Sequence, residues 1–270
     1  MPYLFDHLDS ITELLALSPL GLITDVDGTI SEIAPSPEEA RVSLVCRESL
    51  AALTEQLELV AAISGRPAQN IREMIAVEGM VYIGNHGLEQ WIDGALEFAK
   101  GTEGYRNKVA QALTELKSLL PLEGIILEDK GIALSIHYRQ CPDRELAIRY
   151  VLERISTSAV AKGFRITEGR MVVELRPHLE VNKGTAVGML VERYRLKGGI
   201  YLGDDITDVD AFAAMHSRRE SSSFKGLALG IINEETLSLI DKEADFSLNG
   251  VKDVERFFKW LVESVPRLRR

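Results

Sequence analysis

The sequence predicts an α/β fold, in which a Rossmann-like, doubly wound parallel sheet is interrupted by a smaller α+β domain. Apolar runs without alternating polar residues recur along the chain, and stretches with helical periodicity separate them. Such runs are typical of parallel strands that helices cover on both faces. The runs span residues 21–24, 57–63, 80–85, 199–203, 226–232 and 244–248.

A different pattern separates the third run from the fourth. Two pairs of strand-like segments meet at short turns, and a helical stretch precedes each pair. The helical stretches span 105–120 and 143–157, and the strand pairs span 124–129 with 131–140 and 164–169 with 170–177. This order predicts an α+β domain at residues 101–180, inserted into a core domain of residues 1–100 and 181–270.

The N-terminal segment predicts an amphipathic helix. Apolar residues recur at helical spacing from Leu4 to Leu15, and Pro19 ends the pattern. We therefore expect a helix that packs one face against the core before the first strand begins.

The composition excludes one class of partner. The chain has 270 residues, 46% of them hydrophobic, and its 31 basic and 41 acidic side chains give a net charge of -10. This charge repels a polyanion, so we expect no nucleic-acid partner. A phosphorylated small molecule stays compatible, because a metal ion and a few local cations dominate the field inside a cleft.

Neither the cysteines nor the apolar segments indicate a secreted or membrane protein. Cys46 and Cys141 form no metal-type pair and no disulfide framework. The first residues lack a basic start followed by a continuous apolar stretch, and no run approaches the roughly 18 residues that span a bilayer. We expect a cytoplasmic protein with no membrane partner. The sequence leaves the oligomeric state open, with a monomer as the working expectation.

Two carboxylates follow the first apolar run. Asp25 and Asp27 are spaced by one residue and precede Gly28. Ligands of open α/β sheets bind beyond the carboxyl ends of the strands, and a hard divalent cation offsets the repulsion between two such carboxylates. The plainer interpretation is a solvated turn, since Asp and Gly are favoured turn residues.

Two weaker signals follow later strands. The segment Ser64-Gly65-Arg66 comes directly after the second run, where a hydroxyl and backbone amides at a helix start can hold a phosphate. Lys183 opens the helical stretch that follows the inserted domain. Each has an ordinary alternative, an N-cap serine and a solvated lysine.

A dense acidic cluster follows the fourth run. Asp204, Asp205, Asp208 and Asp210 lie within seven residues directly after an apolar strand. Such a cluster needs a cation or a helix N-terminus to offset its repulsion. An acidic solvated loop would not explain why the first acid follows its strand as abruptly as Asp25 does.

In chain order, these segments resemble the four motifs of the haloacid dehalogenase-like phosphatases, and the resemblance covers nearly the whole chain. More narrowly, the sequence is similar to trehalose-6-phosphate phosphatases, which are hydrolases of trehalose biosynthesis. The segments that carry this similarity are SGR at 64–66, NHGLE at 85–89, HYR at 137–139, GRMVVELRP at 169–177, NKGTA at 182–186 and GDDITDVDAF at 203–212.

The resemblance implies a mechanism. Asp25 would attack phosphorus and form an aspartyl phosphate, and Asp27 would protonate the leaving sugar oxygen and later activate water. Asp27 would need an apolar or anionic neighbourhood to carry a proton near neutral pH. Mg²⁺ would be held by Asp25, the main-chain carbonyl of Asp27 and Asp204, with Asp205 or Asp208 farther from the ion.

The resemblance also implies the substrate contacts. The phosphate would be held by Ser64, Gly65, Arg66 and Lys183. The inserted domain would be a mobile cap that closes over the sugar and excludes water. Its hydroxyl-reading candidates are His137, Arg139, Glu174 and Arg176, with His86 and Glu89 on the core. Arg139 and Glu174 could instead pair with each other across adjoining strands.

Several alternatives stay open at this point. A sucrose-phosphate phosphatase, a mannosyl-3-phosphoglycerate phosphatase or a phosphomannomutase would use the same catalytic residues. A non-catalytic sugar-phosphate sensor or scaffold is a candidate from a different class, although it has no need of both a nucleophile and an acid. The nucleotide-binding motifs GxxxxGK[ST] and GxGxxG follow no strand, which argues against a P-loop or dinucleotide enzyme.

Overall fold

The computed structural model describes residues 1–221, 223–233 and 240–268, and the chain divides into two compact units. The first unit comprises Met1–Glu97 and Val181–Arg270, and the second comprises Phe98–Glu180. The second unit is thus a single insertion between the end of one strand and the start of a helix. None of the helices within the described residues is long and apolar enough to cross a lipid bilayer.

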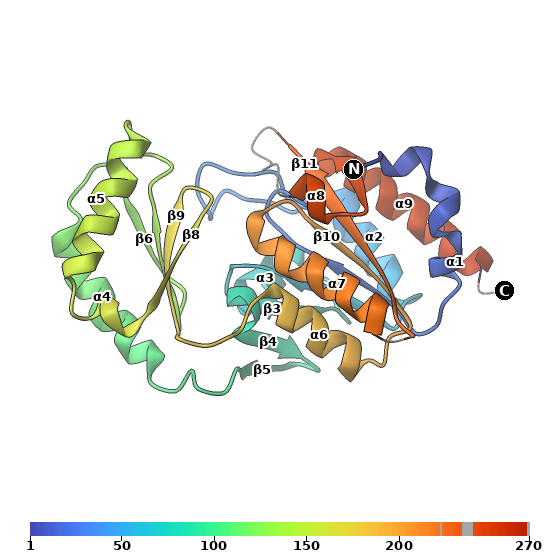
Figure 1. Cartoon of the computed structure of the whole chain (residues 1–270), viewed down its shortest axis with the longest axis horizontal. Coiled ribbons are helices and arrows are strands. Elements are labelled where there is room, and N and C mark those ends of the chain that lie inside the picture. The colour runs from blue at the N-terminus through green and yellow to red at the C-terminus, as the bar shows by residue number, and fades with distance from the viewer. Residues whose placement is uncertain (222, 234–239, 269–270) are drawn as a thin grey trace. The chain divides into compact units, whose positions relative to one another are not determined.

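An eight-stranded sheet with the order β12-β11-β10-β1-β2-β3-β4-β5 forms the centre of the first unit (Figure 1). Its strands from β12 to β3 are parallel, and β4 runs antiparallel to β3. The strands are β1 (Leu20–Thr24), β2 (Leu59–Ile63), β3 (Val81–Gly84), β4 (Glu89–Ile92), β5 (Ala95–Phe98), β10 (Gly198–Gly203), β11 (Lys225–Ile232) and β12 (Phe246–Asn249). The predicted fold class is confirmed, and β4 and β5 extend the sheet beyond the predicted strands.

Helices cover both faces of this sheet (Figure 1). One face carries α2 (Leu44–Thr54), α3 (Ala68–Ile75) and α9 (Gly250–Leu268), and the other carries α6 (Lys183–Arg193), α7 (Val209–Ser221) and α8 (Ile240–Glu243). Two short 3-10 helices, η3 (Asn85–Gly87) and η5 (Ile206–Asp208), lie in loops that follow β3 and β10.

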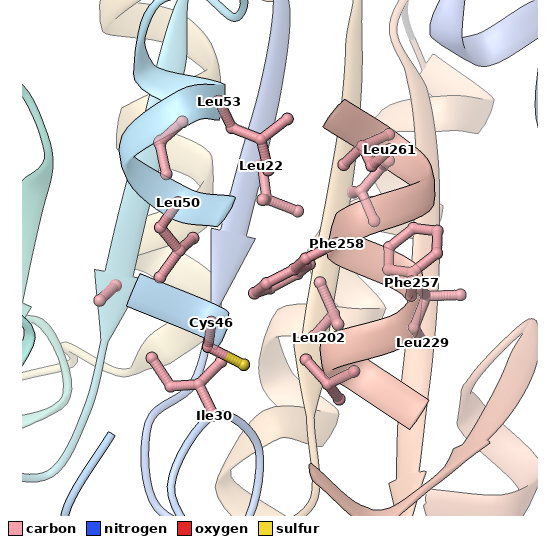
Figure 2. Close-up of a cluster of buried hydrophobic side chains, with 14 of the residues drawn as sticks. Leu22, Ile30, Cys46, Leu50, Leu53, Leu202, Leu229, Phe257, Phe258 and Leu261 are labelled. Carbon is pink, nitrogen blue, oxygen red and sulfur yellow. The ribbon is translucent and has the colours of Figure 1, made fainter. Parts of the chain in front are cut away.

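The two apolar layers explain why the strands show no polar alternation. Successive strand residues point to opposite faces, and here both faces are buried. On β1, Leu22 joins the layer that contains Leu50 of α2 and Phe258 of α9 (Figure 2). Ile23 joins the opposite layer, with Phe212 of α7. Every position of β1 is therefore buried.

The N-terminal segment differs from the prediction. In place of one amphipathic helix it forms η1 (Leu4–Asp6), η2 (Leu8–Ile11) and the one-turn α1 (Thr12–Leu15). The backbone of His7 has φ -134° and ψ 20°, which is outside the helical region and separates the first two turns. The apolar periodicity still marks burial, since Leu4 and Leu15 are fully buried.

The second unit is an α+β domain built on a four-stranded sheet with the order β6-β7-β9-β8. All three pairings are antiparallel, and the two hairpins of the sequence meet where β7 pairs with β9. The apolar residues of β7 and β9 are buried with those of the two helices. The elements are α4 (Tyr105–Leu119), β6 (Ile126–Asp129), β7 (Leu134–His137), α5 (Arg144–Thr157), η4 (Ala161–Gly163), β8 (Arg165–Gly169) and β9 (Val172–Arg176).

Candidate active site

The candidate active site lies at the carboxyl ends of β1 and β10, beside the start of α6. The backbone amide of Asp25 donates to the carbonyl of Leu202 at 2.8 Å, so Asp25 continues the pairing of the two strands. Asp204 follows directly after β10. Asn182 caps α6 by accepting from the amide of Thr185 at 2.8 Å, which places Lys183 at the first helical position.

Lys183 joins residues that are far apart in the sequence. Its Nζ donates to Oδ1 of Asp25 and to Oδ1 of Asp208, both at 2.7 Å, and all three side chains are buried. Burial by itself would lower the pKa of Lys183, but the carboxylates of Asp208 and Asp25 raise it above its usual value. The lysine is therefore a fixed positive charge at the strand ends.

Asp25 is crowded by negative charge. Burial raises the pKa of Asp25 well above its usual range, Lys183 opposes this shift, and the carboxylates of Asp208 and Asp204 add to it. An additional cation beside Asp25 would favour the ionised carboxylate, which is the form that a nucleophile needs.

The donor set fits one divalent cation. Asp25, Asp204 and Asp208 each offer a carboxylate oxygen, and these oxygens lie within 4.8 Å of one another. Three carboxylates against the one ammonium of Lys183 leave a net charge of two negative units, which one Mg²⁺ would balance. Gly28 permits this approach, because a Cβ at its φ of +85° would lie 2.0 Å from Oδ2 of Asp204.

Asp205 and Asp208 also accept hydrogen bonds from backbone amides of the loop. The side chain of Asp205 accepts from the amide of Ile206 at 2.7 Å and caps η5. Oδ2 of Asp208 accepts from the amides of Asp204 and Asp205 at 3.1 and 2.9 Å. Asp208 therefore shapes the loop in addition to holding Lys183.

Asp27 has a cationic neighbour, where the sequence analysis expected an apolar or anionic one. Nε and Nη2 of Arg66 donate to the two carboxylate oxygens of Asp27 at 2.7 and 2.8 Å. Arg66 also donates to the carbonyl of Pro37 at 2.9 Å and to Asn70 at 3.2 Å. The expectation about the surroundings of Asp27 was wrong, because Arg66 was taken as a phosphate ligand alone.

Ser64, Gly65 and His86 lie together after β2 and β3. The hydroxyl of Ser64 accepts from the amide of Arg66 at 3.2 Å, and the amide of His86 donates to the carbonyl of Ser64 at 2.9 Å. A Cβ on Gly65 would lie 2.7 Å from Nε2 of His86, so only glycine leaves room for this ring. The structure thus brings His86 to the segment that we expected to hold phosphate.

Glu89 has partners inside the fold. One of its oxygens accepts from the amide of Ala68 at 2.8 Å, and the other accepts from Nδ2 of Asn85 at 2.7 Å. Ala68 begins α3, so the carboxylate satisfies an amide that a helix start leaves open. These contacts let Glu89 hold the loop after β3, and its contact with substrate stays a prediction.

Polar side chains form a row across the sheet of the second unit. Nζ of Lys130 donates to Glu174 at 2.9 Å, and the hydroxyl of Ser135 donates to the same oxygen at 3.1 Å. Nε2 of His137 lies 2.7 Å from Glu128. Ser135 pairs in register with both Glu128 and Glu174, so the row crosses three strands. We call these five residues the polar row.

The sequence analysis missed three members of the polar row, Glu128, Lys130 and Ser135. Lys130 and Glu128 stand next to a turn in the segment EDKG, which is typical of a solvated hairpin loop. The burial of Lys130, which is 7% exposed, is the signal that only the structure provides. Of the other candidates here, Arg139 accepts from Arg144 through its carbonyl, and Arg176 pairs in register with Arg165 at the sheet edge.

Two further contacts in the site involve residues that no sequence pattern marked. Nδ2 of Asn233, at the end of β11, donates to Oδ2 of Asp204 at 3.0 Å. The hydroxyl of Tyr201, inside β10, donates to Oδ1 of Asp208. Asn233 lies outside the matched motifs, and Tyr201 lies inside an apolar run. Composition and spacing therefore mark neither residue.

The fold is the α/β fold with an inserted domain that the resemblance to haloacid dehalogenase-like proteins implied, and the buried Asp25, Lys183 and Asp204 lie at the ends of its strands and the start of α6. The Trehalose-phosphatase family matches residues 23–232, and the chain belongs to this family.

Relatives agree with this placement. A trehalose-phosphate phosphatase of Mycobacterium leprae is 33% identical over 227 residues, which are 80% of this chain and 52% of the relative. The probable trehalose-phosphate phosphatase D of Arabidopsis thaliana is 28% identical in an alignment of 283 residues, which covers 97% of this chain and 72% of the relative. An uncharacterized glycosyl hydrolase of Mycobacterium tuberculosis is 35% identical over 200 residues, which are only 15% of that protein. The chain thus spans about half or less of the length of several relatives.

Solved structures show the same fold. The C-terminal domain of trehalose-6-phosphate phosphatase from C. albicans has a TM-score of 0.79 and 20% identity, and the match covers 97% of this chain and 98% of that one. A trehalose-6-phosphate phosphatase related protein has a TM-score of 0.75 and 21% identity, with 92% and 99% coverage.

Proposed function

We propose that this chain is a Mg²⁺-dependent phosphomonoesterase that hydrolyses trehalose 6-phosphate to trehalose and inorganic phosphate. The observation that carries the proposal is the buried cluster of Asp25, Asp204 and Asp208 around Lys183. Phosphoryl transfer depends mainly on positioning and charge neutralisation, and this cluster supplies both. Membership of the Trehalose-phosphatase family and the names of the relatives support the choice of substrate.

The chemistry would proceed in two steps. A carboxylate oxygen of Asp25 forms a bond to phosphorus while the bond to the sugar oxygen breaks, and this oxygen takes a proton from Asp27. Water then gives a proton to Asp27 and attacks the aspartyl phosphate, which releases phosphate and restores Asp25. Lys183 and Ser64 hold non-bridging oxygens. Mg²⁺, held by Asp25, the carbonyl of Asp27 and Asp204, would neutralise charge on the phosphoryl group.

Arg66 takes part in the first step through Asp27. The bidentate pair holds the carboxylate of Asp27 in one orientation, and protonation of the leaving oxygen requires Asp27 to exchange this partner. A phosphate dianion is a strong competing acceptor for the guanidinium. We expect substrate to draw Arg66 to the phosphate and so to release Asp27, whose carboxylate then takes up a proton from solvent before it acts as the acid.

The polar row of the second unit would recognise the sugar. Carboxylates accept hydrogen bonds and an ammonium donates them, so Glu128, Glu174 and Lys130 together match a molecule rich in hydroxyl groups. His137 and Ser135 add groups that can do both. The row carries no apolar side chain of its own, which suits a sugar better than a flat hydrophobic alcohol.

The test is phosphate release from trehalose 6-phosphate, sucrose 6-phosphate, glucose 6-phosphate and p-nitrophenyl phosphate, with Mg²⁺ or with EDTA, for wild type and Asp25→Asn. The proposal predicts Mg²⁺-dependent turnover that is selective for trehalose 6-phosphate and lost in the variant. Selectivity for another ester would keep the chemistry and reject the substrate. Binding without turnover of any ester would identify a non-catalytic sensor instead.

A further inference from the structure

We propose that Tyr201 is a positioning residue of the phosphoryl-transfer site, which fixes Lys183 by holding Asp208. The inference rests on the proposed function and adds a residue that no motif contains. Tyr201 lies inside β10, three residues before Asp204, and its side chain is fully buried. Its ring packs edge-on against Phe212 with centroids 5.8 Å apart, so the phenol has a fixed direction.

The hydroxyl of Tyr201 points to a charged acceptor. It donates to Oδ1 of Asp208, the same oxygen that accepts from Lys183. A hydrogen bond to a charged group is stronger than one between neutral groups.

The hydrogen bond from Tyr201 fills the last acceptor position of the Asp208 carboxylate. A carboxylate offers about four acceptor positions. In Asp208, Oδ1 accepts from Tyr201 and Lys183, and Oδ2 accepts from the amides of Asp204 and Asp205. All of the positions are therefore taken by donors of the chain itself. This leaves Asp25 and Asp204 as the direct carboxylate ligands of a cation, with Asp208 as the anchor of Lys183.

Loss of the phenol would disturb Lys183 more than the metal. Without the phenol, Oδ1 of Asp208 loses one of its two donors. We expect the ammonium of Lys183 then to move closer to Asp208 and away from Asp25. The ammonium is the group expected on the transferred phosphoryl oxygens. The cation ligands Asp25 and Asp204 have no hydrogen bond to the phenol.

The chain offers a matched control in Tyr82. Tyr82 is also a buried tyrosine of the same sheet, but its hydroxyl donates to the main-chain carbonyl of Val77. Tyr201→Phe and Tyr82→Phe each remove a phenol oxygen from a buried ring, one on β10 and the other on β3 of the same sheet. A role in folding alone would make the two variants behave alike.

The experiment compares wild type, Tyr201→Phe and Tyr82→Phe by three measurements. Thermal melting checks folding, Mn²⁺ titration followed by electron paramagnetic resonance reports metal affinity, and ¹⁹F NMR with Mg²⁺ reports binding of beryllium trifluoride, a mimic of the phosphoryl group on Asp25. Steady-state kinetics with trehalose 6-phosphate gives kcat and KM.

For Tyr201→Phe we expect kcat and beryllium trifluoride affinity to fall about tenfold, with KM nearly unchanged, as for the loss of one hydrogen bond to a charged group. Mn²⁺ affinity should stay within about threefold, because the direct ligands keep their contacts. Tyr82→Phe should lower the melting temperature without changing either affinity or kcat.

Two results would overturn the inference. Equal effects of the two substitutions on kcat would reduce Tyr201 to a core residue, and a tenfold or larger loss of Mn²⁺ affinity in Tyr201→Phe would make Asp208 a direct ligand. If wild type hydrolyses no ester, the proposed function fails, while beryllium trifluoride binding still decides the role of Tyr201.

Discussion

Two buried lysines mark two different kinds of polar site in this chain. Lys183 lies among Asp25, Asp204 and Asp208, so three carboxylates gather around one ammonium. Lys130 lies among Glu128 and Glu174, with His137 adjacent, so one negative charge remains when the imidazole is neutral. The first cluster calls for a divalent cation, whereas the second suits a neutral ligand with many hydroxyl groups.

The backbone around the two clusters differs in the same way. The first cluster lies at strand ends and a capped helix start, where loop amides hold Asp208 and the turn at Gly28 leaves room for Asp204. The polar row lies on the second sheet, where hydrogen bonds join its side chains to one another. Unbalanced charge that backbone groups hold in place indicates a catalytic site. Nearly balanced charge between side chains indicates a site that binds a ligand.

The largest expected effect comes from removing the first lysine. Lys183→Met leaves three buried carboxylates without their ammonium, so we expect kcat to fall by about a thousandfold or more and the free energy of unfolding without metal to fall by about 3 kcal/mol. Phosphate release and urea melts measure the two losses. Near-normal turnover in this variant would contradict the assignment of the first cluster to catalysis and the second to sugar binding.

Removing the second lysine should separate recognition from chemistry. We expect Lys130→Met to lower kcat/KM for trehalose 6-phosphate by about tenfold to a hundredfold, mainly through KM, because Glu174 loses its partner and the sugar loses a donor. Hydrolysis of p-nitrophenyl phosphate, which has no sugar, should be unchanged. An equal loss with both substrates would place Lys130 in the folding of the chain instead.

A smaller effect is expected at the edge of the first cluster. Arg66→Lys keeps the charge but removes the planar fork that orients Asp27 before substrate binds and that would then bind the phosphate, so we expect kcat to fall by about tenfold. Arg41→Lys is a suitable control, since Arg41 donates only to nearby carbonyls. The orientation account of Asp27 fails if the two substitutions have the same effect on turnover.

The sequence predicted the catalytic cluster better than its surroundings. The role of Lys183 came from the resemblance to known phosphatases. Asp25 and Asp204 were both expected at one edge of the sheet because parallel strands bring their carboxyl ends together. Topology carried this prediction, and it needed no side-chain geometry. The apolar runs likewise predicted the parallel strands, since burial on both faces leaves a clear pattern.

Other features left no pattern to find. Tyr201 stands in an apolar run and has the appearance of a core residue until its hydroxyl is placed against Asp208. Lys130 stands beside a turn, where lysines are usually solvated. The partner of Asp27 depends on the conformation of a single arginine side chain, which spacing cannot specify. The prediction of a single N-terminal helix was wrong for a local reason, because the backbone of His7 lies outside the helical region.

The most direct test of the central claim is the number and affinity of Mg²⁺ ions bound by wild type, Asp204→Asn and Asp205→Asn, measured by isothermal titration calorimetry. The two acids are adjacent, but Asp204 faces the cluster and Asp205 caps η5. We predict one ion for wild type and Asp205→Asn, and binding weakened by about a hundredfold for Asp204→Asn. Equal binding by all three proteins would contradict the account.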